Sequence, residues 1–226
     1  QAAALRMASQ SEGRRPLRAL LFDIDGTLFE SDPLHFAVFK EVLVEYGYGG
    51  GEPISQDFFL KSISGRTNAL ICADLFPDWT TAQAEAFAAD KEQRYRDLAE
   101  ERLPELKMPG LERIFAWADA QGLLKAAVTN APRANAEQML RAIGRLDWFD
   151  TLVIGDECSA GKPDPEPYLE AMRRLEVQAT ESIAFEDSPS GAQAAVAAGV
   201  RTIGLLSTRP AEELLAVGCR AVVTDF

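Results

Sequence analysis

Residues 19–27 read Ala-Leu-Leu-Phe-Asp-Ile-Asp-Gly-Thr, a short apolar run followed by two acids, and this stretch decides the fold. Side chains two residues apart in an extended segment point the same way, so Asp23 and Asp25 should converge just beyond the end of a strand. Two carboxylates at one point suggest chemistry. The same pattern is also compatible with a strand that runs into an Asp-Gly turn, so other segments must decide.

Three later segments place polar groups after apolar runs or in a restrained loop. A strand that ends in Thr-Asn is ordinary turn chemistry, a loop lysine is usually solvated, and acids before Ser-Pro can cap a helix. Together, in this order and at the carboxyl ends of predicted strands, they favour a single site. The segments are residues 126–130 (Ala-Ala-Val-Thr-Asn), 161–165 (Gly-Lys-Pro-Asp-Pro) and 183–188 (Ile-Ala-Phe-Glu-Asp-Ser).

The spacing of apolar residues predicts an α/β fold with a Rossmann-like parallel sheet. Ligands of such sheets bind at the carboxyl ends of the strands, where the polar motifs lie. A sixth short strand is predicted at residues 221–226. The other strands are predicted at 19–22, 124–129, 151–155, 182–186 and 201–206, with helices at 110–121, 133–143, 166–175 and 192–198.

Residues 31–104 differ in character and predict a helical cap domain inserted into the core. Apolar residues at helical spacing mark residues 33–46, and a long alanine-rich helix at 80–101 begins with a plausible cap at Thr80. The core domain is then residues 17–30 and 105–226, with two linkers side by side as a hinge. Residues 1–16 are polar and predicted to be disordered, either as a tag before Met7 or as a remnant of a transit segment.

Composition limits the classes of partner. The chain has 226 residues and a formal net charge of −12, which argues against nucleic-acid binding, and no run is long enough to span a membrane. An anionic substrate would be repelled at long range, so a phosphate site needs a local positive charge or a metal. The odd number of separated cysteines, Cys72, Cys158 and Cys219, indicates reduced thiols. We expect a cytoplasmic monomer, with a plastid location also compatible.

The set of four motifs resembles the haloacid dehalogenase superfamily from about residue 17 to the C-terminus. Within it, the chain resembles the β-phosphoglucomutase branch, and most of all the plant broad-range sugar-phosphate phosphatases. The segments that carry this likeness are Leu-Phe-Asp-Ile-Asp-Gly-Thr-Leu, Glu-Ser-Asp-Pro-Leu-His, Ala-Ala-Val-Thr-Asn-Ala-Pro and Ala-Phe-Glu-Asp-Ser. The resemblance implies a Mg²⁺-dependent hydrolase of small sugar or polyol phosphate monoesters.

The resemblance also implies roles for single residues. Asp23 would be the nucleophile that forms an aspartyl-phosphate, and Asp25 the acid that protonates the leaving oxygen and then the base that activates water. Lys162 would balance charge, and Thr129 and Asn130 would bind phosphoryl oxygens. The Mg²⁺ ligands would be Asp23, the Asp25 backbone carbonyl, Asp187 and, directly or through water, Glu186. Charge counting agrees, because four carboxylates and one lysine leave −3 before phosphate arrives.

Two cap residues are candidates for substrate binding. His35 is the only histidine and lies ten residues after Asp25, although a helix residue at the domain seam is an equally good interpretation. Arg66 follows Ser-Gly in a loop that faces the active site in relatives, and its ordinary alternative is a solvated helix start.

A phosphosugar mutase is the alternative reaction. Mutases of the resembled branch carry a cap lysine shortly after a tyrosine to grip a second phosphate, and here Tyr95 is followed by Arg96 and Asp97. The acid disfavours a second phosphate. A dehalogenase and a catalytically silent binding module are less compatible, because all the acids of metal-dependent phosphoryl chemistry are retained.

Overall fold

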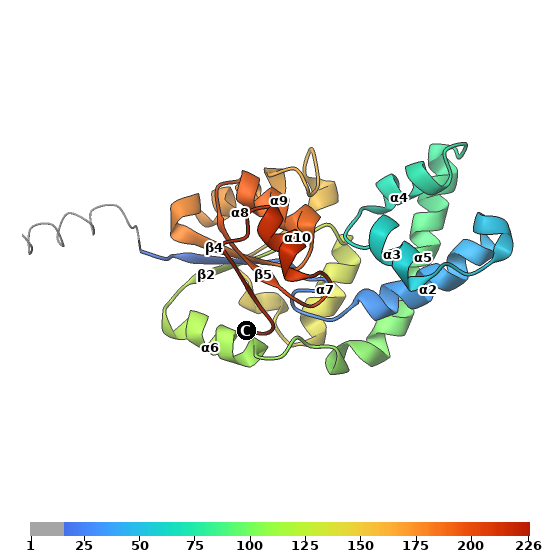
Figure 1. Ribbon diagram of the computed structural model, residues 1–226. Helices are drawn as coiled ribbons and strands as arrows, with labels where there is room; N and C mark the ends of the chain where they lie inside the picture. Colours follow the sequence, from blue (N-terminus) through green and yellow to red (C-terminus); the bar gives the residue numbers. More distant parts are fainter. Residues whose placement is uncertain (1–15) are drawn as a thin grey trace, which may run out of the picture.

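The computed structural model describes residues 16–226 and shows an α/β core with a helical insertion (Figure 1). The strands are β1 (Ala19–Phe22), β2 (Leu124–Thr129), β3 (Thr151–Ile154), β4 (Ser182–Glu186), β5 (Arg201–Leu205) and β6 (Ala221–Val223). The core helices are α6 (Leu111–Ala120), α7 (Arg133–Ala142), α8 (Glu166–Leu175), α9 (Pro189–Ala197) and α10 (Ala211–Ala216). The insertion holds α2 (Asp32–Glu45), α3 (Gln56–Ser62), α4 (Asn68–Leu75) and α5 (Thr81–Arg102).

The six strands form one parallel sheet in the order β3-β2-β1-β4-β5-β6, which confirms the predicted fold class. Connections after β1 run to one side and those after β4 to the other, so the switch in strand order lies between β1 and β4. Such a switch point leaves a crevice at the carboxyl ends of the strands. The predicted polar motifs of β1, β2 and β4 therefore meet at one edge of the sheet.

Strand β1 is buried on both faces, which explains its unbroken apolar run. Leu20 and Phe22 pack toward α6 and α7, whereas Ala19 and Leu21 pack toward α8 and α9. The ring of Phe22 is fully buried and contacts five aromatic rings, those of Phe115, Trp148, Phe149, Phe185 and Phe226. The strand that carries the two acids is thus anchored by the apolar core on both sides.

The insertion has an apolar core of its own, built around Phe39, Phe59 and Phe87. Helix α5 begins at the predicted cap, where Thr80 and Gln83 form a reciprocal capping box. The two linkers lie side by side, because the amide of Glu30 donates to Leu106 at 2.8 Å and that of Met108 donates to Leu28 at 2.9 Å. The cap is thereby joined to the core by a short two-stranded connection.

Some elements differ from expectation. Helix α9 begins at Pro189, three residues before the predicted start, because Pro is well suited to a first helical turn and Ser188 caps it. The short helices α3, α4 and α10 were not predicted, since eight residues or fewer give little periodic signal. The prediction of a disordered segment at residues 1–16 falls almost entirely outside the described residues.

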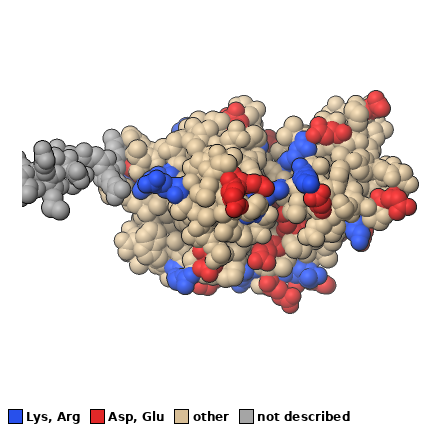
Figure 2. Space-filling model, viewed as in Figure 1, with Lys and Arg blue, Asp and Glu red and all other residues tan. Residues whose placement is uncertain are grey.

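The described helices include none long and apolar enough to cross a membrane. On the face shown in Figure 2, basic side chains are scattered among acidic ones and form no continuous stripe. This face therefore offers no extended surface for a polyanion.

We expect Phe22→Ala to lower the free energy of unfolding by about 3–5 kcal/mol, because it leaves a cavity among five rings. Chemical unfolding in EDTA measures this without any contribution from a metal. Trp117→Ala is the matched control, since the Trp117 side chain is 42% exposed and should lose far less. Equal losses in the two variants would contradict the central place of Phe22.

Candidate active site

A pocket lies between the sheet edge and the cap and brings together most of the predicted site residues. The core contributes Asp23, Asp25, Thr129, Asn130, Lys162 and Asp187, and the cap contributes His35, Arg66, Lys91 and Glu92 among others. Glu186 lies beneath the pocket and is fully buried.

Lys162 is the centre of the site. Its ammonium donates to Asp23 Oδ1 and to Glu186 Oε1, both at 2.6 Å, and to the carbonyl of Val128 at 2.7 Å. Burial lowers the pKa of Lys162, but the charges of the two carboxylates more than offset it, so the pKa is raised. The lysine is therefore a fixed positive charge that holds Asp23 in place.

The single positive charge of Lys162 does not balance the negative charges of the acids around it. Burial, opposed by Lys162 and supported by Glu186, raises the pKa of Asp23 to about 8. Burial and then the charges of Asp23 and Glu186 raise the pKa of Asp187 well above its ordinary value. Asp23 Oδ2 and Glu186 Oε2 are buried without a hydrogen-bond partner. One oxygen from each of the three acids lies within 4.8 Å of the others, so the donor set fits a hard cation such as Mg²⁺.

Asp187 is oriented by hydroxyl groups from two loops. Thr208 donates to Asp187 Oδ2 at 2.5 Å, and Thr27 donates to Oδ1 at 3.3 Å. Gly26 adopts a φ of +77°, and a Cβ there would lie 2.0 Å from Asp187 Oδ2. Glycine is thus required at this position both for its backbone conformation and for the space that the carboxylate occupies.

Glu186 is set behind Lys162. Its Oε1 accepts from Lys162 and from the hydroxyl of Tyr168 at 2.5 Å. A Cβ at Gly191 would lie 2.1 Å from the same oxygen, so the start of α9 is shaped around this carboxylate. Tyr168 was not singled out in the sequence, because a tyrosine in the middle of an amphipathic helix gives no signal of its own. The role of Glu186 as a metal ligand stays a prediction.

The residues that end β2 face the loop of Lys162. The Asn130 amide donates to the Lys162 carbonyl, and its oxygen accepts from the Lys162 amide, each at 3.0 Å. Thr129 Oγ1 accepts from the amide of Ala131 at 2.9 Å. The Asn130 side chain therefore holds the Lys162 loop instead of pointing a free amide at a phosphate. Phosphate binding by Thr129 and Asn130 stays a prediction.

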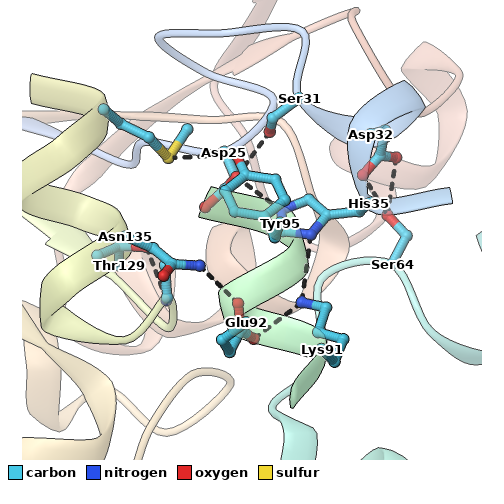
Figure 3. Close-up of polar contacts among 12 residues, drawn as sticks. Asp25, Ser31, Asp32, His35, Ser64, Lys91, Glu92, Tyr95, Thr129 and Asn135 are labelled. Carbon is cyan, nitrogen blue, oxygen red and sulfur yellow. Dashed lines mark hydrogen bonds and ion pairs between the residues drawn. The ribbon is translucent and has the colours of Figure 1, made fainter. Parts of the chain in front are cut away.

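The Asp25 carboxylate turns toward the cap linker. Asp25 Oδ1 accepts from Ser31 Oγ at 2.6 Å and from His35 Nε2 at 3.0 Å (Figure 3). Burial raises the pKa of Asp25, but the hydrogen bonds from His35 and Ser31 outweigh burial, so the pKa is lowered. In this arrangement Asp25 is ionised and able to accept a proton.

His35 is held between Asp25 and Lys91. The Lys91 ammonium donates to His35 Nδ1 at 3.3 Å, so Nε2 carries the proton that is donated to Asp25. The imidazole stacks on Tyr95, with centroids 4.1 Å apart. Figure 3 shows these side chains converging from α2 and α5. His35 thus contacts the predicted acid directly, and Lys91, which the sequence did not single out, orients it.

Arg66 lines the pocket as predicted, but its guanidinium has partners within the cap. It donates to Asp74 Oδ2 at 2.5 Å and to the carbonyl of Ser62 at 2.8 Å. Its contribution to substrate binding stays a prediction.

Fold and site together define an α/β protein with a helical cap and a buried centre of acids and one lysine. The chain belongs to the haloacid dehalogenase-like hydrolase family, whose model matches residues 20–205. It is 29% identical over 213 residues to the phosphorylated carbohydrates phosphatase of Thermotoga maritima, across 92% of this chain and 94% of the relative.

Two further relatives are a mutase and a protein crystallised with a sugar bisphosphate. The chain is 27% identical over 199 residues to the β-phosphoglucomutase of Bacillus subtilis, across 86% of this chain and 85% of the relative. It matches a crystal structure of a CbbY mutant from Rhodobacter sphaeroides in complex with xylulose-(1,5)bisphosphate, with a TM-score of 0.81 and 27% identity over 92% of this chain and 94% of that one. These relatives are bacterial, so a particular closeness to the plant enzymes stays a prediction.

We expect Mg²⁺ to raise the melting temperature of the native protein and Asp187→Asn to abolish that rise, because the substitution removes one of three clustered carboxylates that could hold the ion. In EDTA the variant should melt a few degrees higher than the native protein. The raised pKa values of Asp23 and Asp187 favour the folded state at low pH, and this contribution is lost as pH rises toward about 8. The advantage of the Asp187 variant over the native protein should therefore grow as the pH rises above about 4, the ordinary pKa of an aspartate.

Thermal melts with and without Mg²⁺ measure both effects, with Asp97→Asn, an exposed cap carboxylate, as control. An unchanged Mg²⁺ response in the Asp187 variant would contradict the assignment.

Proposed function

We propose that the protein is a Mg²⁺-dependent phosphatase that hydrolyses small sugar or polyol phosphate monoesters through an aspartyl-phosphate. The observation that carries the proposal is the state of Asp23. One of its oxygens is held by Lys162 at 2.6 Å, while the other is buried at the base of the pocket without a hydrogen-bond partner. A carboxylate with one tethered and one free oxygen is suited to act as a nucleophile.

In the first step, Asp23 attacks phosphorus while the bond from phosphorus to the sugar oxygen breaks, and Asp25 gives that oxygen a proton. In the second step, Asp25 takes a proton from water as the water attacks the phosphorus of the aspartyl-phosphate and frees Asp23. The lowered pKa of Asp25 suits the second step. The negative charge of an arriving phosphate would raise that pKa and so favour the protonated form needed for the first.

Asp23, Asp187 and the backbone carbonyl of Asp25 would hold Mg²⁺, with Glu186 direct or through water. The metal would supply positive charge against the phosphoryl oxygens. Lys162 supplies a fixed positive charge from the protein side, and its bond to Asp23 keeps the nucleophile oriented. The Asn130 side chain contributes by fixing the loop that carries Lys162.

A phosphatase is favoured over a mutase by the cap cations that line the pocket. Among the described residues there, Lys91 is paired with Glu92 at 2.8 Å and Arg66 with Asp74 at 2.5 Å, so the charge of each is already balanced within the cap and neither offers an uncompensated positive charge to a second phosphate. The sequence suggested that Asp97 would repel a second phosphate. Asp97 does not line the pocket, and neither does Arg96, which donates to Asn135, so this repulsion does not arise there.

The test is a panel of hexose, pentose and triose monophosphates with Mg²⁺ or EDTA, together with β-glucose 1-phosphate plus a bisphosphate activator. We expect hydrolysis of several monophosphates with modest discrimination, and no activity in EDTA. Asp23→Asn should lower kcat by about a thousandfold or more while the fold survives. Efficient interconversion of glucose 1- and 6-phosphates would identify a mutase, and a fully active Asp23 variant would refute the covalent route.

Arg66→Ala should raise KM by about tenfold and change kcat by less than about threefold, if Arg66 contacts the body of the substrate and not the reacting phosphoryl group. Steady-state kinetics on the preferred monophosphate measures the two constants separately. Arg94→Ala is the control, because Arg94 pairs with Glu45 and Asp90 away from the pocket lining. A fall in kcat alone would place Arg66 at the reacting group instead.

A further inference from the structure

The polar chain that starts at Asp25 continues beyond Lys91 and returns to the core. Glu92 follows Lys91 on α5 and is 7% exposed. Its Oε1 accepts from Lys91 Nζ at 2.8 Å and from Asn68 Nδ2 at 2.6 Å. Its Oε2 accepts from Nδ2 of Asn135 at 2.5 Å (Figure 3). Both oxygens of this carboxylate are therefore occupied.

Asn135 belongs to α7 of the core and is 1% exposed. Its Oδ1 accepts from Arg96 Nη1 at 2.9 Å, so its amide nitrogen is the group that faces Glu92. Glu92 and Arg96 are four residues apart and lie on one side of α5. Helix α5 of the cap therefore makes hydrogen bonds with both the amide oxygen and the amide nitrogen of Asn135 in the core.

Glu92 also decides where the buried ammonium of Lys91 can lie. The other close neighbours of that ammonium are His35 Nδ1 at 3.3 Å and the rings of Phe39 at 4.8 Å and Tyr95 at 5.6 Å, and none of them is anionic. Burial raises the pKa of Glu92, but the charge of Lys91 and the hydrogen bond from Asn68 outweigh it and lower the pKa. An ionised Glu92 compensates Lys91. Without it, a buried cation would lose its partner and be drawn away toward solvent.

We propose that Glu92 and Asn135 are positioning residues for the proton donor of the leaving group. Asn135 holds Glu92, Glu92 holds Lys91, and Lys91 fixes the imidazole of His35 that hydrogen-bonds Asp25. The position of the Asp25 carboxyl therefore depends on the contact between α5 and α7. This inference rests on the proposed phosphatase activity, and it assigns neither residue any contact with substrate.

Leaving-group dependence separates such a role from a general structural one. A sugar oxygen needs a proton as it leaves, whereas the nitrophenolate of p-nitrophenyl phosphate leaves without one. Values of kcat/KM report the first transfer to Asp23 alone, so a change in the second step does not enter. Glu92→Gln and Asn135→Ala are compared with Gln138→Ala, which removes a different α5–α7 contact, the 2.9 Å bond to the Arg96 carbonyl.

We expect both test variants to lower kcat/KM for the best sugar monophosphate by about tenfold or more, and that for p-nitrophenyl phosphate by less than about threefold. Gln138→Ala should change the two substrates equally and little. Equal losses on both substrates in Glu92→Gln, or no loss on either, would overturn the inference. A native enzyme that hydrolyses neither substrate would instead refute the proposed function.

A second measurement does not need activity. His35 is the only histidine of the chain, so a long-range ¹H–¹⁵N spectrum of the untagged protein contains one imidazole. The native protein should show a protonated Nε2 and an unprotonated Nδ1. Glu92→Gln keeps the size of the native residue, and it should lose this fixed tautomer, as should Asn135→Ala if it folds. Native imidazole signals in Glu92→Gln would overturn the inference.

Discussion

The rest of the site depends on the buried ammonium of Lys162. An isolated cation there would be prohibitively unstable, and its presence is compatible with the fold only because Asp23 and Glu186 each approach it at 2.6 Å. The dependence is mutual, since the same ammonium allows the two carboxylates to lie close together. Three features keep these side chains in place: the Asn130 amide holds the Lys162 loop, the Tyr168 hydroxyl donates to Glu186, and Gly191 at the start of α9 leaves room for the Glu186 carboxylate.

The sheet explains why residues so far apart in sequence meet here. Parallel strands end at one edge, and β1 is the strand next to which the order of the sheet reverses. The acids after β1 and β4 are thereby neighbours, and the loop of Lys162 closes over them. The cap enters and leaves through paired linkers beside the same edge, so α2 and α5 bring His35 and Lys91 to Asp25.

The sequence predicted the parts of the site that follow strands, because polar residues after an apolar run have a known direction at a known edge. Asp23, Asp25 and Asp187 are examples, whereas Lys162 was predicted from its place in a loop flanked by prolines. It did not predict Glu92 or Asn135, because both lie within helices, where a polar residue is ordinary, and their partners come from the other domain. The orientation of the Asn130 amide was equally hidden, since a side chain's partner depends on loops that propensity does not fix. Short helices were missed for lack of periodicity.

The two polar networks of the site differ in their balance of charge. In the network between the cap and the core, the charges of Asp25, Lys91, Glu92 and Arg96 alternate in sign and sum to zero. This network can therefore be buried without a further ion to balance its charge. At the sheet edge, three carboxylates surround one lysine and leave two negative charges when all are ionised. The imbalance is confined to the place where a phosphoryl group would react. A divalent cation would neutralise it there, while the balanced network next to it can hold Asp25, the proposed proton donor, in place without competing for that cation.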